Sequence, residues 1–149
     1  MTYCVGLLLK AGMVLLSDTR TNAGLDNIAT YRKMFTFEVP GERVIVMMTA
    51  GSLSVTQTTI ARLREAIEHP EEAEGQSILT ARTLLDVAQI VGNTLSSVRH
   101  DINAKMEASK VSTSASIILA GQRRGGTMRM FLIYPEGNFI EATEDTPYL

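Results

Sequence analysis

The chain has 149 residues, a formal net charge of −2, and 45% hydrophobic against 20% charged residues. These proportions are ordinary for one globular domain, and they exclude a disordered tail, a collagen-like rod and a coiled coil. A weakly acidic chain also lacks the basic face with which general nucleic-acid binders displace counterions, so no nucleic-acid partner is expected.

Features of targeting, redox chemistry and metal binding are sparse. No apolar run approaches the ~20 residues that span a bilayer, and Lys10 interrupts the apolar start of the chain, so we expect neither a signal peptide nor a membrane partner. The single cysteine, Cys4, excludes an internal disulfide and favours a reducing, cytoplasmic location. The two histidines, His69 and His100, show no zinc-type ligand spacing, so neither a metal nor a cofactor is expected.

The first third of the chain predicts four strands, at residues 2–9, 13–17, 31–39 and 44–49. The first two form a hairpin, because the short segment between them contains a glycine. In the third, apolar and polar residues alternate, which places Lys33 on the same face as Phe35 and Phe37. The fourth is almost wholly apolar, as in a strand that is buried on both faces.

The middle of the chain predicts two helices. Ser52 or Ser54 caps the first, which ends at about His69 because a proline follows. Ser77 begins the second, whose apolar residues recur at helical spacing as far as the region of Glu107. Strand-forming sequence returns at residues 116–120, 128–134 and 139–142. Strands grouped apart from helices predict an α+β fold with antiparallel sheets.

Thr2, which directly follows the initiator methionine, is the first candidate for chemistry. If Met1 is removed, Thr2 carries both a hydroxyl and a free α-amine. An amine with an ordinary pKa of about 7.7–8.0 accepts the hydroxyl proton near neutral pH, so one residue serves as nucleophile and base. Many proteins begin with Met-Thr, and this feature alone does not assign catalysis.

Asp18 and Lys33 strengthen that hypothesis. The hairpin returns Asp18 to the sheet end near Thr2, and Lys33 lies on the next predicted strand. An ammonium beside the Thr2 hydroxyl favours its ionised form, and a carboxylate beside the lysine keeps it charged and oriented. The alternatives are a surface ion pair around Asp18 and a solvated strand edge at Lys33. Because Lys33 shares a face with apolar residues, it needs a partner, which favours the catalytic interpretation slightly.

Gly51 lies between a buried strand and a helix. Its backbone amide is placed to stabilise an oxyanion, because amides at a helix N-terminus point outward and a glycine lets a carbonyl approach. A simple strand-to-helix turn is the competing interpretation. Nearby, Met47 and Met48 either line an adaptable apolar pocket or belong to the core, which is the commoner place for methionine.

Taken together, four segments resemble a known family: residues 2–6 (TYCVG), 17–24 (SDTRTNAG), 26–28 (DNI) and 32–34 (RKM). They are similar to the bacterial proteasome-related ancestral beta subunits, the Anbu family, which belongs with proteasome beta subunits among the N-terminal-nucleophile hydrolases. The resemblance covers the whole chain and is strongest over residues 2–34. It implies a four-layer α-β-β-α sandwich and a threonine-type peptidase that works through an acyl-enzyme.

The resemblance also implies a role for each site residue. Thr2 is the nucleophile and base, Lys33 is its electrostatic activator, and Asp18 orients Lys33. The remaining implied roles are Gly51 as the donor to the oxyanion, Arg20 as a brace of the Asp18 loop, and Thr21 with Asn22 as an extended segment that pairs with the substrate backbone.

Members of this family assemble into rings or ring-like spirals, so we expect a homo-oligomer that acts on a peptide or protein substrate, with no ATPase partner indicated. Family members continue well past Leu149, and the later serine and aspartate that support the threonine have no counterpart in this sequence. The sequence therefore predicts one proteasome-beta-like domain over residues 1–149 that lacks its C-terminal part.

Two other functions remain open. One is a self-assembling structural subunit with little or no peptidase activity, which retention of Met1 would favour because a blocked amine cannot act as base. The other is a small-molecule amidase on the same fold, which comparison of peptide and simple amide substrates would distinguish from a peptidase.

Overall fold

The structure is a computed structural model that describes residues 2–22, 28–73, 76–106 and 112–149. Strands β1 (Cys4–Leu9) and β2 (Gly12–Ser17) form the predicted antiparallel hairpin, with Cys4 opposite Ser17. Two short strands that the hydrophobic pattern does not predict, β3 (Arg20–Asn22) and β4 (Ile28–Thr30), also pair antiparallel. Three residues are too few to show a period of two, which is why these strands escape a pattern-based prediction.

The main sheet has five antiparallel strands in the order β5-β6-β7-β8-β9. Its strands are β5 (Met34–Val39), β6 (Arg43–Gly51), β7 (Ala115–Arg123), β8 (Arg129–Ile133) and β9 (Phe139–Glu141). Each lies within a few residues of a predicted strand, and the central pair β6–β7 ends with Gly51 opposite Ala115. An entirely antiparallel sheet agrees with the predicted α+β class.

Helix α1 (Leu53–Glu68) has Ser52 at its N-cap position, although the Ser52 side chain makes no capping hydrogen bond. Helix α2 begins at Leu84 and runs to Met106, so the prediction that it starts at Ser77 is wrong. The reason is a capping box: the backbone N–H of Thr83 donates to Asp86 Oδ2, and the Asp86 N–H donates to Thr83 Oγ1. No described helix is long and apolar enough to cross a membrane.

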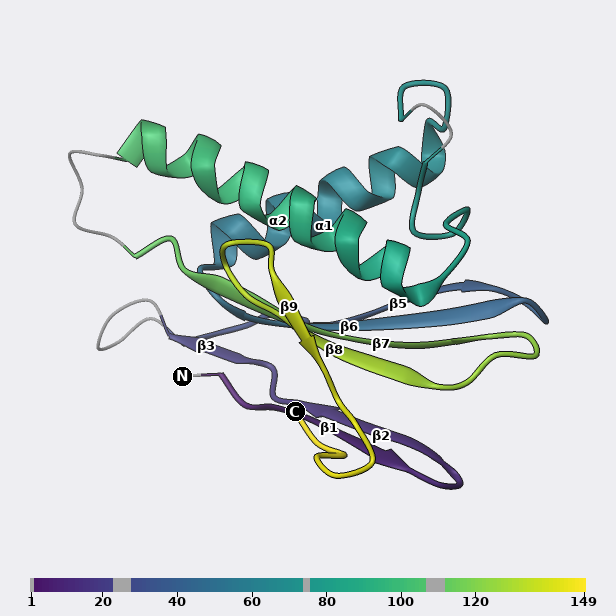
Figure 1. Ribbon diagram of the computed structural model, residues 1–149. Coiled ribbons are helices and arrows are strands. Elements are labelled where there is room, and N and C mark those ends of the chain that lie inside the picture. Colours follow the sequence, from purple (N-terminus) through teal and green to yellow (C-terminus); the bar gives the residue numbers. More distant parts are fainter. Residues whose placement is uncertain (1, 23–27, 74–75, 107–111) are drawn as a thin grey trace.

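Figure 1 shows three stacked layers: the two helices, the five-stranded sheet and the β1–β2 hairpin. One core lies between the helices and the sheet, where Ile45, Val91 and Phe131 are fully buried. A second, smaller core lies between the sheet and the hairpin, around Met48 and Met130. The expected four-layer sandwich has a further helical layer, which is not among the described residues.

Gly92 marks a close contact between α2 and the turn that joins β8 to β9. A Cβ placed on Gly92 would lie 2.2 Å from the Gly137 carbonyl oxygen. Replacing glycine by alanine in a helix interior usually stabilises by about 0.5–1 kcal/mol. Here the methyl group meets backbone, so we expect Gly92→Ala to lower the free energy of unfolding by about 1–3 kcal/mol in urea titrations.

The matched control is Asn93→Ala, because Asn93 is exposed on the same helix turn. It should change the free energy of unfolding by less than about 0.5 kcal/mol. A Gly92→Ala variant that is more stable than the parent chain would contradict the proposed contact.

Candidate active site

Lys33 is the centre of a polar cluster at the end of the β1–β2 hairpin. Its side chain is 7% exposed, and its Nζ donates to both Asp18 oxygens at 2.9 and 2.8 Å. The same ammonium donates to the Arg20 carbonyl oxygen at 2.6 Å and to Thr2 Oγ1 at 3.2 Å. The buried cation therefore has an anionic partner, as burial requires, and the threonine hydroxyl lies within its hydrogen-bonding distance.

Backbone hydrogen bonds from three parts of the chain hold this cluster in place. The N–H of Tyr3 donates to Asp18 Oδ1 and the N–H of Arg20 donates to Asp18 Oδ2, so the carboxylate is fixed by its own loop and by the start of the chain. The Thr49 N–H on β6 donates to the Lys33 carbonyl oxygen at 2.9 Å, which ties the segment before β5 to the central sheet. The Asp18, Lys33 and Thr2 side chains thus meet as the sequence predicts.

The Lys33 ammonium, followed by the hydrogen bond from the Tyr3 N–H, lowers the pKa of the Asp18 carboxyl from 3.8 to about 2. Because the folded-state pKa lies below the unfolded one, Asp18 stabilises the fold fully above about pH 5. That stabilisation is lost as the pH falls through 3.8 towards 2.

We therefore expect the free energy of unfolding of the parent chain to be larger than that of Asp18→Asn at pH 6–7. When the free energy of unfolding of each protein is plotted against pH, the two curves should converge below about pH 2. Urea titrations of both proteins between pH 7 and pH 2 measure the difference. A gap between the two proteins that stays constant down to pH 2 would contradict this assignment.

A pocket of about 100 Å³ opens beside Thr2 and Lys33. Gly51 lies on its rim, at the junction of β6 and α1, with a φ of +98°. A Cβ on Gly51 would lie 2.3 Å from the Ser114 carbonyl oxygen, so this position requires glycine. Gly51 and Thr2 therefore share one pocket. The pocket is also lined by Arg32, Phe35, Thr49, Leu53, Thr56 and Gln57.

The other residues that the sequence singles out lie in different surroundings. Arg20 contributes through its backbone, which donates to Asp18 and accepts from Lys33, while its side chain lies in an exposed position. Thr21 and Asn22 lie in β3, whose backbone is extended and pairs with β4. Met47 and Met48 are 0% and 1% exposed and belong to the two cores, as the commoner interpretation of buried methionines expects.

Three residues near the cluster, Thr49, Cys4 and Arg32, are not among the site residues that the sequence predicts. Thr49 lies two positions before Gly51 on β6, so strand parity places both on one face and could have indicated it. The Cys4 thiol lies 3.8 Å from the Thr49 carbonyl oxygen. Burial, and then the Asp18 charge, raise the pKa of this thiol, which keeps it protonated and makes it a poor nucleophile. Arg32, which precedes Lys33 in the chain, also lines the pocket.

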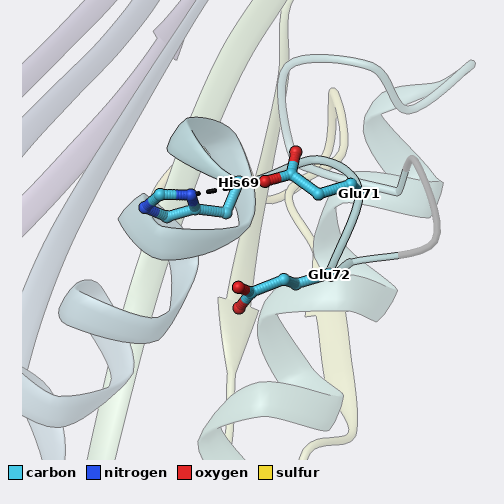
Figure 2. A group of neighbouring side chains, drawn as sticks. All are labelled: His69, Glu71 and Glu72. Carbon is cyan, nitrogen blue, oxygen red and sulfur yellow. Dashed lines mark ion pairs between the residues drawn. The ribbon is translucent and has the colours of Figure 1, made fainter.

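A second cluster lies far from this site, on the turn after α1. Figure 2 shows His69, Glu71 and Glu72 there, with a dashed line for the ion pair between His69 and Glu71. One possible ligand atom from each residue lies within 4.8 Å of the others, and His69 Nδ1 is 3.5 Å from Glu71 Oε1. All three side chains are exposed. Exposed carboxylates on a surface turn keep their water, and we assign no metal site to this group.

No family model matches the chain, and a search of curated proteins also found no match. Solved structures match it over its whole length. The helical assembly of the Anbu complex from Pseudomonas aeruginosa is 42% identical, with a TM-score of 0.90. The ancestral beta-subunit Anbu from Yersinia bercovieri is 38% identical, with a TM-score of 0.88, and both matches cover 99% of this chain. The chain belongs to the Anbu family.

An Anbu mutant from a Hyphomicrobium species is also similar, with 38% identity, a TM-score of 0.86 and a match over 100% of this chain. The chain spans 58–59% of the length of these three Anbu chains. The matched part contains the Thr2, Asp18 and Lys33 cluster and the Gly51 pocket. The family resemblance of residues 2–34 is thereby confirmed, and it relates the chain to proteasome beta subunits.

Proposed function

We propose that this chain carries the nucleophile of a proteasome-like threonine peptidase, which hydrolyses peptide bonds through an acyl-enzyme on Thr2. The observation that carries the proposal is the hydrogen bond from the buried Lys33 ammonium to Thr2 Oγ1, at 3.2 Å. Lys33 is also bound to Asp18, so its charge is available in a fixed position. Preorganised charge beside a nucleophile is a large source of rate acceleration.

The mechanism requires removal of Met1, which frees the Thr2 α-amine. The amine takes the hydroxyl proton, and Oγ1 attacks the carbonyl carbon while Lys33 stabilises the developing alkoxide. The protonated amine then gives its proton to the leaving amine as the peptide bond breaks. Water, deprotonated by the same amine, attacks the resulting ester and releases the acid product, which restores the Thr2 hydroxyl.

The roles proposed for Gly51, Thr21, Asn22 and Arg20 follow from where these residues lie relative to Thr2 and Lys33. The Gly51 amide is assigned to the oxyanion of the tetrahedral intermediate, because Gly51 lines the pocket that contains Thr2. The backbone of Thr21 and Asn22 is assigned to strand pairing with the substrate, which its extended conformation in β3 supports. Arg20 acts as a positioning residue through its backbone contacts with Asp18 and Lys33.

We further propose that the chain forms part of a four-layer α-β-β-α sandwich that self-assembles in the cytoplasm. The three observed layers and the helical assembly of the Pseudomonas aeruginosa Anbu complex support this. The alternative, which the same assembly favours, is a self-assembling, proteasome-like structural subunit with little or no peptidase activity. The two functions differ in whether the Thr2 amine is free.

The test combines an intact mass with covalent labelling of the protein expressed from its native gene. We expect a mass that begins at Thr2, and one equivalent of adduct with a peptide epoxyketone, which needs a hydroxyl and an α-amine on the same residue. Retained Met1 and no adduct would overturn the peptidase proposal and leave the structural subunit.

A further inference from the structure

The pocket beside Thr2 is small enough to select one substrate side chain. Its volume of about 100 Å³ is well below the several hundred Å³ of drug-sized ligand sites. Four parts of the fold form it: the start of the chain at Thr2, residues 32–35 at the start of β5, the end of β6 and the first turns of α1. A peptide whose carbonyl lies between Thr2 and Gly51 would place its adjacent side chain there.

The charged side chains that line the pocket are all positive among the described residues. Arg32 and Lys33 are the charged residues among the described side chains that line the pocket, and both are cations. Lys33 is neutralised by Asp18, whereas Arg32 is exposed and makes no hydrogen bond or ion pair with any described residue. An arginine beside a small pocket, without a carboxylate of its own, is suited to bind one from a ligand.

Neighbouring groups add to this positive potential. The Arg64 guanidinium lies over the Phe35 ring at 5.7 Å from its centroid, and Phe35 forms one wall of the pocket. Helix α1 begins at the pocket with no acidic residue in its first turn, so its N-terminal dipole is not offset there. Of the polar side chains, the Thr56 hydroxyl is occupied by the Leu53 carbonyl, whereas exposed Gln57 offers an amide donor.

We propose that this pocket accepts an acidic side chain, glutamate or aspartate, at the substrate residue whose carbonyl Thr2 attacks, and that Arg32 is the specificity-determining residue. The inference rests on the proposed function in that Thr2 defines which substrate residue occupies the pocket. A neutral amide of the same shape loses the charge-assisted hydrogen bond, so glutamate should be distinguished from glutamine.

The first experiment compares two fluorogenic tetrapeptide amides that differ only in Glu or Gln before the cleaved bond. We expect kcat/KM to be at least about tenfold higher for the Glu peptide. Arg32→Gln should abolish this preference for the Glu peptide. In Arg32→Glu, kcat/KM should be higher for a Lys peptide than for the Glu peptide. Arg124→Gln is the matched control, because Arg124 is an exposed arginine on the turn between β7 and β8 and should leave the ratio unchanged.

The second experiment separates this inference from the proposed function. Calorimetry measures binding of product peptides that end in Glu or Gln to the Thr2→Ala variant, which cannot react. Tighter binding of the Glu product that is lost in Thr2→Ala/Arg32→Gln supports the inference even if no peptide is ever cleaved. Equal binding, preference for Gln or no binding of either product overturns it, while cleavage of the Gln peptide would leave the peptidase proposal intact.

Discussion

Thr2→Ala should lower peptide turnover by roughly 10⁴-fold or more, to the background rate, and should abolish covalent labelling. The reason is chemical: the variant lacks the hydroxyl that accepts a hydrogen bond from Lys33 Nζ at 3.2 Å. The fold should survive, because Lys33 retains both Asp18 oxygens and the Arg20 carbonyl as acceptors. We expect the free energy of unfolding to change by no more than about 1 kcal/mol.

The control is Thr2→Ser, which keeps a hydroxyl and an α-amine on the same residue and should retain measurable turnover. Initial rates with a peptide amide, together with urea titrations of each variant, provide the readout. Undiminished turnover by a folded Thr2→Ala protein would remove Thr2 from the mechanism and would sink the peptidase proposal in its present form.

Lys33→Met should affect both activity and stability, since methionine has a similar length but no charge. It removes the donor to Thr2 Oγ1, and we expect the labelling rate of Thr2 to fall by about 10²–10³-fold. It also leaves the Arg20 carbonyl oxygen without its ammonium donor, so the free energy of unfolding should fall by about 1–3 kcal/mol. The pKa of Asp18 should rise from about 2 towards 3.8, which carboxyl NMR titration measures.

Two further variants make this prediction specific to the site. Lys10→Met removes a lysine at an exposed position on the hairpin turn and should change neither rate nor stability. Lys33→Arg should not restore the parent labelling rate, because a planar guanidinium is larger than an ammonium and places its donors differently. Parent-like labelling in Lys33→Met would show that the ammonium plays no part in activating Thr2.

Much of the candidate active-site cluster could be predicted, because it follows from features of short stretches of the chain. The hairpin of residues 2–17 returns Asp18 to the level of Thr2, and strand parity in residues 31–39 places Lys33 on the apolar face. A lysine on such a face needs an anionic partner, and Asp18 is the carboxylate that the hairpin brings close to it. The start of the second helix is not predictable from apolar spacing, because that spacing continues upstream of the Thr83–Asp86 capping box, where α2 begins.

The lining of the pocket could not be predicted, because it brings together residues from four separate parts of the chain. Arg32 lies just before β5, whereas Gln57 lies in the first turns of α1, and only the pairing of β5 with β6 brings them to one opening. The sequence around Arg32 fits a solvated strand edge equally well. Its place in a pocket is a consequence of long-range packing.

By itself, the sequence determined the antiparallel α+β class, the two helices, the family and the identity of the Thr2, Asp18 and Lys33 group. These depend on hydrophobic period, turn residues and local motifs, which are properties of neighbouring residues. The tertiary structure alone decided that the Lys33 ammonium reaches Thr2 Oγ1, that Gly51 requires glycine because the Ser114 carbonyl lies against it, and that Arg32 faces the pocket. Those features depend on distances between residues remote in the chain, which only the packing of the hairpin and α1 against the central sheet sets.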